Sequence, residues 1–129
     1  MKYIIADPDR QNGIALKKLL DGCDRLDFQG SYTTFGATEK DSLEHPPDIA
    51  FIRLGKAELN AFRLAEAIRE RNPLAKVVFI SSQREDAVEA FEYEAAGFLL
   101  IPFSKKKIGL LLQQNIGGKE MDKFEHGKR

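Results

Sequence analysis

The stretch PDIAFIRLGKA, residues 47–57, contains an unbroken apolar run from Ile49 to Ile52, followed at once by Arg53. Such a run is typical of a strand buried on both faces, as in a parallel sheet covered by helices. Arg53 then stands where this strand should end. In open α/β sheets, ligands bind at the carboxyl ends of the strands. The stretch therefore predicts a buried central strand with a cation at a functional edge.

Similar apolar runs recur at regular intervals along the chain. Three further buried strands are expected at residues 3–6, 77–80 and 98–101. A strand that is half exposed or lies at a sheet edge is indicated by residues that alternate with polar ones: Leu26, Phe28, Gly30 and Tyr32. The chain thus contains material for five short strands.

Between these strands, apolar residues recur with the period of a helix. Asp9 is the expected N-cap of the first helix, whose apolar face holds Leu16, Leu19, Leu20 and Cys23. Weaker and stronger helical patterns follow at about 36–45 and 60–71. A fourth helix is marked by Val88, Phe91 and Ala95 and is expected to stop at Gly97. Ser104 is the expected cap of a fifth, with Ile108, Leu111, Leu112 and Ile116 on one face.

The regular alternation of strand and helix predicts an α/β fold: a doubly wound parallel sheet with helices on both faces. We expect one domain over residues 1–116, followed at 117–129 by a flexible tail or the start of a linker. With 129 residues, 43% of them hydrophobic, the chain is long enough for a substantial core.

Charge and cysteine content exclude several function classes. Twenty basic and twenty acidic residues give a net charge of +0, so nothing indicates direct binding to nucleic acid or to a membrane surface. No apolar run is long enough to span a bilayer. The single cysteine, Cys23, cannot form an internal disulfide, which favours a reducing cytoplasm.

The predicted strand ends bring a small set of side chains to one edge of the sheet. These candidate site residues are Asp7, Asp9, Arg53, Ser81 and Ile101. We expect them to line one crevice, because the carboxyl ends of the strands converge there.

The chain resembles the CheY-like receiver domain of bacterial response regulators. The resemblance is carried by YIIADPDR, by PDIAFIRLGKAELNAFRLAEAIRERNP and by VVFISSQREDAVEAFEYEAAGFLLIPFS. It implies a flavodoxin-like (βα)5 fold with strand order 2-1-3-4-5. It also implies, for a working member, an aspartate that accepts a phosphoryl group at the end of the third strand. Two acidic residues that help to hold Mg²⁺, a hydroxyl and a lysine would surround that aspartate.

Matched position by position, this sequence lacks most of that machinery. The acceptor position holds Arg53, the lysine position holds Ile101, and the acidic pair is Asp7 and Pro8; only Ser81 keeps the expected hydroxyl. A guanidinium stays protonated and cannot be a phosphoryl acceptor. We therefore expect a pseudo-receiver with no bound metal, no cofactor and no enzymatic activity. Phosphorylation on Asp7 or Asp9 is a less favoured alternative.

The sequence permits two interpretations of Arg53. It could pair with Asp7, and also with Asp9, replacing the missing metal by a fixed cation in a bidentate arrangement. It could instead point into solvent. We favour the ion pair, because Asp7 otherwise lies uncompensated at a crowded strand end.

The resemblance places the interaction face on the fourth helix, the fifth strand and the fifth helix. The residues expected there include Glu89, Phe91, Phe98, Lys105 and Lys106. The acidic fourth helix and the basic start of the fifth make a homodimer through this face chemically reasonable. For the lysines taken by themselves, a solvated surface is the favoured interpretation. A DNA-binding effector, attached or separate, would be the partner. The alternative function is a small-molecule or anion sensor that uses the degenerate crevice.

Overall fold

The computed structural model describes residues 1–116, so the predicted tail at 117–129 lies outside the described residues. Strands and helices alternate in the order β1 (Lys2–Ala6), α1 (Arg10–Leu20), β2 (Asp27–Tyr32), α2 (Phe35–Glu44), β3 (Ile49–Arg53), α3 (Ala61–Arg71), β4 (Lys76–Ser81), α4 (Asp86–Glu92), β5 (Gly97–Leu100) and α5 (Lys105–Asn115). All four strand pairings are parallel, and the order across the sheet is β2-β1-β3-β4-β5. The predicted fold class is confirmed.

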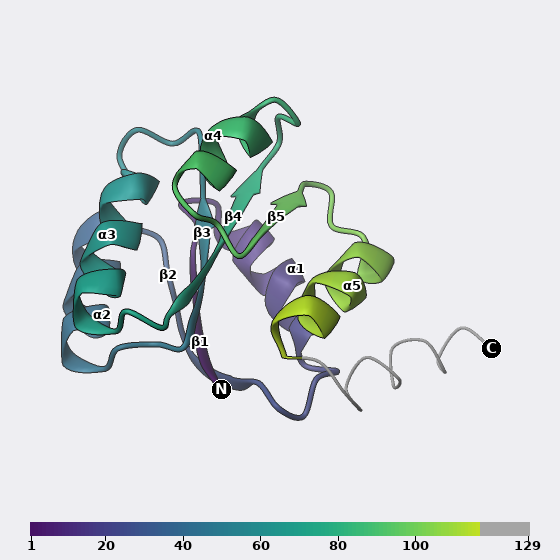
Figure 1. Cartoon of the computed structure of the whole chain (residues 1–129), viewed down its shortest axis with the longest axis horizontal. Coiled ribbons are helices and arrows are strands. Elements are labelled where there is room, and N and C mark those ends of the chain that lie inside the picture. Colours follow the sequence, from purple (N-terminus) through teal and green to yellow (C-terminus); the bar gives the residue numbers. More distant parts are fainter. Residues whose placement is uncertain (117–129) are drawn as a thin grey trace.

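The sheet separates two apolar cores, which explains why its central strands are apolar at consecutive positions. Tyr3 and Ile5 of β1 face the core beneath α1 and α5, whereas Ile4 and Ala6 face the core beneath α2, α3 and α4. Figure 1 shows these two helical layers on opposite sides of the sheet. All residues of β3 are buried. A strand covered on both faces has no polar side to present to water, so the period-two alternation disappears.

Several helix caps follow the chemistry that the sequence indicates. The Asp9 carboxylate accepts the Gln11 amide at the start of α1, and the Ser104 hydroxyl accepts the Lys107 amide at the start of α5. These side chains satisfy backbone N–H groups that have no partner within the helix. Gly13 inside α1 also has a packing reason, since a Cβ there would lie 2.9 Å from the Ser31 Oγ. The helix can therefore approach β2 closely.

The prediction for α4 is wrong in its extent. The helix ends at Glu92, and Gly97 begins β5 instead of stopping the helix. Val88 and Phe91 are 69% and 54% exposed, whereas Ala90 is fully buried. The helix therefore meets the core through a small residue and leaves its large apolar side chains outside. No helix within residues 1–116 is long and apolar enough to cross a membrane.

Tyr3 provides a test of the core beneath α1. Its hydroxyl is buried without a hydrogen-bond partner, and burial raises the pKa of Tyr3 from 10.0 to about 12. Because the folded state favours the neutral phenol, this contribution to stability is fully present below pH 10 and is lost as the pH rises towards 12.

We expect Tyr3→Phe to be at least as stable as wild type near neutral pH, since it removes an unsatisfied polar atom. Above pH 10 the variant should become progressively more stable than wild type, by about 1.4 kcal/mol for each pH unit within that window. Urea unfolding of both proteins at a series of pH values measures the difference. If the stability difference between the two proteins stayed constant as the pH rises above 10, the raised pKa of Tyr3 would be contradicted.

Candidate functional site

The predicted site residues lie at or just after the carboxyl ends of the strands. Figure 1 shows α4 at the same end of the sheet. Asp7 directly follows β1, Arg53 is the last residue of β3, and Ser81 is the last residue of β4. Ile101 directly follows β5, and Asp9 caps α1. The parallel register brings the ends of β1, β3 and β4 side by side, so side chains far apart in sequence meet here.

Arg53 and Asp7 form the charged centre of this crevice. The Arg53 Nη1 lies 3.4 Å from the Asp7 Oδ2, within an ion pair whose side chains are only 9% and 1% exposed. The other Asp7 oxygen, Oδ1, accepts the Asp9 amide at 2.8 Å. The Arg53 Nε is buried and has no hydrogen-bond partner. The expected ion pair is present, as a single contact and not as the bidentate arrangement.

Asp9 does not share in that ion pair as the sequence suggested it could. Its Oδ1 accepts the Gln11 amide at 2.9 Å, which is the N-cap bond of α1. Capping orients the carboxylate towards the helix, while its backbone N–H is used to hold Asp7. Asp9 therefore supports the crevice through its main chain.

Burial makes the two charges dependent on each other. Desolvating two ions can cost as much as their attraction returns, so the pair is not by itself evidence of stability. Removing one partner, however, leaves an uncompensated charge among buried side chains. A substitution that removes only Arg53 or only Asp7 should therefore destabilise the domain.

Ser81 and Ile101 complete the crevice without adding a group free to bind a ligand. The Ser81 hydroxyl donates to the Asp86 Oδ2 at 2.6 Å and accepts the Gln83 amide at 2.9 Å. This ties the end of β4 to the start of α4. Ile101 is half buried and packs against the core beneath α1 and α5. An aliphatic side chain thus contributes packing at the position where the resemblance would put a cation.

The residues present do not fit a magnesium ion. Mg²⁺ requires an octahedral set of oxygen ligands, usually including one or two carboxylates. Here the Asp7 Oδ2 faces a guanidinium and its Oδ1 accepts a backbone amide. Within residues 1–116, no three acidic, histidine or cysteine side chains lie together in a way that could hold a metal. The fixed positive charge of Arg53 opposes a second cation at this place.

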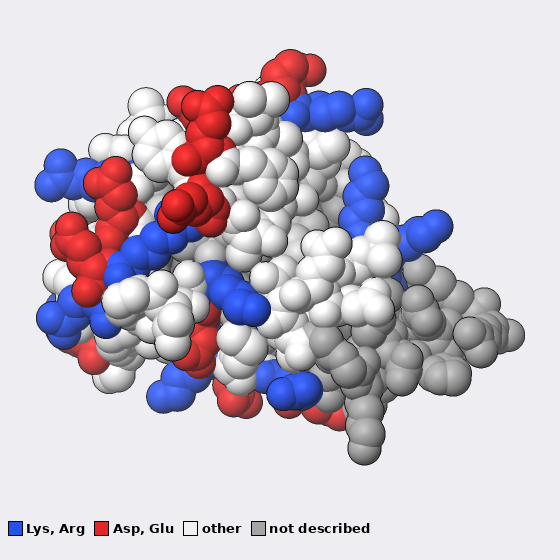
Figure 2. Space-filling model, viewed as in Figure 1, with Lys and Arg blue, Asp and Glu red and all other residues white. Residues whose placement is uncertain are grey.

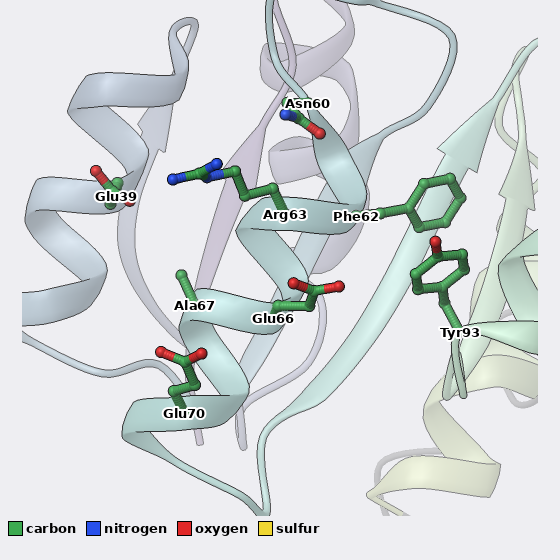
Figure 3. A pocket seen from close by; sticks show the side chains of 8 residues that line it. All are labelled: Glu39, Asn60, Phe62, Arg63, Glu66, Ala67, Glu70 and Tyr93. Atoms are coloured by element: carbon green, nitrogen blue, oxygen red, sulfur yellow. The ribbon is translucent and has the colours of Figure 1, made fainter.

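A groove that the sequence did not indicate lies elsewhere, over α3. Its volume is about 490 Å³, and it is lined by Glu39, Asn60, Phe62, Arg63, Glu66, Ala67, Glu70 and Tyr93 (Figure 3). It shares no residue with the crevice. Tyr93 stacks on Phe62 at one side of this groove, with ring centroids 4.1 Å apart (Figure 3). These aromatic residues belong to different elements, so no local pattern could have paired them.

The predicted interaction face is largely accessible. Four of its residues are exposed: Glu89, Phe91, Lys105 and Lys106. Phe98 is half buried against the core beneath α2, α3 and α4. Figure 2 shows acidic side chains over α4, basic ones near the start of α5, and an uncharged surface between them. A surface with an apolar centre and charges of opposite sign at its ends is suited to protein contact.

Comparison with known proteins agrees with this architecture. No family model matches the chain. Sensory transduction protein LytT of Bacillus anthracis is 26% identical over 109 residues, which cover 84% of this chain and 44% of LytT. Protein MrkE of Klebsiella pneumoniae is 30% identical over 115 residues, and transcriptional regulatory protein YpdB of Escherichia coli is 29% identical over 115 residues. These cover 88% of this chain but only 42% and 47% of those proteins.

The crystal structure of the response regulatory domain of MrkE matches along nearly its whole length. It superimposes with a TM-score of 0.78 and 27% identity, covering 98% of this chain and 99% of that domain. The fold and these relatives strongly support a receiver domain of the CheY-like, response-regulator class. The chain spans less than half the length of the curated relatives named here.

Proposed function

We propose that this chain is a phosphorylation-independent receiver domain, which acts in signalling or transcription regulation as an interaction and dimerisation module. The observation that carries the proposal is the buried Arg53 guanidinium at the end of β3, paired with Asp7. The relatives support the signalling role, because their names describe sensory transduction and transcriptional regulation.

The chemistry of the crevice argues against phosphoryl transfer. Such transfer needs an oxygen nucleophile and cations placed on the transferring oxygens. Arg53 carries no nucleophilic lone pair, and Ile101 supplies no cation. The Ser81 hydroxyl is already committed to Asp86 and Gln83. The domain would accordingly work without a phosphate trigger, without a metal or other cofactor, and not as an enzyme.

The proposed output surface consists of α4, β5 and α5. Val88 and Phe91 supply its exposed apolar centre, with Glu89 beside them and Lys105 and Lys106 at the start of α5. In a two-fold dimer, the acidic side chains of one copy can meet the basic ones of the other. Such a dimer would pair attached or separate effector domains in the cytoplasm. Any contact with DNA would belong to those effectors.

Amide NMR during titration with beryllofluoride or acetyl phosphate and Mg²⁺ tests phosphorylation independence. We expect no saturable shift at residues 7–10, 53–56 or 81–86, while a receiver with an intact acceptor aspartate responds under the same conditions. A saturable response here, or a gain of one phosphate in the intact mass, would refute the proposal.

A second amide NMR titration, with anions and without Mg²⁺, tests the sensor alternative. Saturable shifts produced by an inorganic or carboxylate anion without Mg²⁺, and lost in Arg53→Met, would favour an anion sensor over the proposed module. We favour the module because Arg53 and Ser81 both have partners within the chain.

A further inference from the structure

The turn that follows α4 is fastened to α3 by a single arginine. The Arg69 Nη1 donates to the Tyr93 carbonyl oxygen at 2.6 Å, and its Nη2 donates to the Glu94 carbonyl oxygen at 2.7 Å. A planar guanidinium can hold two adjacent carbonyl groups at once, which a lysine ammonium cannot do with the same geometry. The two bonded residues follow Arg69 by 24 and 25 positions in the sequence, so these hydrogen bonds connect α3 to a distant turn.

The backbone of this turn is shaped to present those carbonyl groups. The Ala95 amide donates to the Ala90 carbonyl and the Glu94 amide donates to the Phe91 carbonyl, which is the pattern of a Schellman motif. Glu94 takes the left-handed position of that motif, with φ 59°, where glycine is usual. A glutamate in this conformation is strained, so the surrounding contacts must hold it there.

An aromatic contact supports the same turn from the same helix. Phe62 of α3 stacks on Tyr93 with an interplanar angle of 21° (Figure 3). The Phe62 ring also contacts the ring of Phe79 in β4, with centroids 5.1 Å apart. Phe79 is fully buried. The row Phe79–Phe62–Tyr93 therefore connects the core to the turn at the surface. We call Arg69, Phe62 and the Tyr93–Glu94 turn the α3 clasp.

Little else holds α4 in position. The helix runs only from Asp86 to Glu92, and Ala90 is its one buried residue among those described. A single alanine makes a small contribution to packing. The start of the helix is held by the bond between Ser81 and Asp86, and the end by the α3 clasp. The position of α4 is thus set by its two ends.

We propose that the α3 clasp fixes α4 on the domain and thereby controls the surface formed by Val88 and Phe91. The role of that surface as a dimer interface rests on the function proposed above. The clasp itself does not, because it follows from contacts within one chain. If Arg69 is released, the strained turn opens first, and the exposed apolar residues of α4 lose their fixed orientation.

Hydrogen exchange of the Tyr93, Glu94 and Ala95 amides tests the clasp directly in Arg69→Ala. Arg71→Ala is the matched control, because Arg71 lies on the same helix but donates to the Leu43 carbonyl at 2.9 Å, far from α4. We expect exchange of these three amides to accelerate about tenfold or more in Arg69→Ala only, since local opening then costs less. Amides of β3 should be unchanged in both variants. Equal exchange in the two variants would overturn the proposal.

Sedimentation of the same proteins tests the link to the surface. We expect Arg69→Ala to weaken the dimer, while Arg71→Ala leaves it as in wild type. Faster exchange with an unchanged dimer would overturn the proposed control of the surface. A monomeric wild type would instead contradict the proposed function, and the exchange data alone would then decide whether the clasp holds α4.

Discussion

Replacing Arg53 with aspartate is expected to remove about 3–5 kcal/mol from the free energy of unfolding, the cost typical of breaking a buried ion pair. The substitution removes the cation that faces Asp7, whose side chain is only 1% exposed, and adds a second carboxylate at the same place. Two like charges in a poorly solvated site repel each other strongly. Urea unfolding followed by circular dichroism in metal-free buffer measures the change.

Arg53→Met and Asp7→Asn provide the matched controls. Methionine fills a similar volume without charge, and asparagine keeps the Oδ1 that accepts the Asp9 amide at 2.8 Å. Each single substitution should destabilise the domain, because it leaves one charge buried alone. The double variant should lie closer to wild type than the sum of the two single changes. An Arg53→Asp protein with the urea midpoint of wild type would show that the pair is not coupled.

The double substitution Val88→Asp and Phe91→Asp is expected to raise the dimer dissociation constant by at least about 100-fold, or about 2.7 kcal/mol. Both side chains are exposed, 69% and 54%, and their spacing of three residues places them on one face of α4. Aspartates there replace an apolar contact with desolvated negative charge on a helix that is already acidic. Sedimentation equilibrium at tens of micromolar measures the constant.

Leu74→Asp is the control for this second prediction. Leu74 is 87% exposed but lies in the turn between α3 and β4, away from the proposed interface. It should leave the dimer unchanged, and all these proteins should unfold at similar urea concentrations because the altered side chains are exposed. If the α4 variant dimerises as wild type does, the interface lies on another face. A wild-type protein that is monomeric at these concentrations would refute dimerisation itself.

Much of the architecture is determined by short-range information in the sequence. Strands buried on both faces are apolar at consecutive positions. The runs at Ile49–Ile52 and Val77–Ile80 can therefore be identified as strands from the local sequence alone. Regular alternation of such runs with helical patterns then leaves very few topologies. The position of Arg53 at a strand end also follows from the sequence, and with it the candidate crevice. The helix caps at Asp9 and Ser104 could also be predicted, because capping depends on a few neighbouring residues.

The tertiary structure alone decided the features that depend on distant partners. Whether Asp9 pairs with Arg53 or caps α1 depends on the geometry of the chain, and the sequence permitted both. The end of α4 was predicted too far along the chain, because Ala95 continues the apolar spacing although the helix ends at Glu92. The bonds from Arg69 to the Tyr93 and Glu94 carbonyls carry no sequence signal, since a backbone acceptor looks the same in every residue. Local patterning specifies which segments become buried, whereas contacts between side chains and distant backbone exist only once those segments have packed.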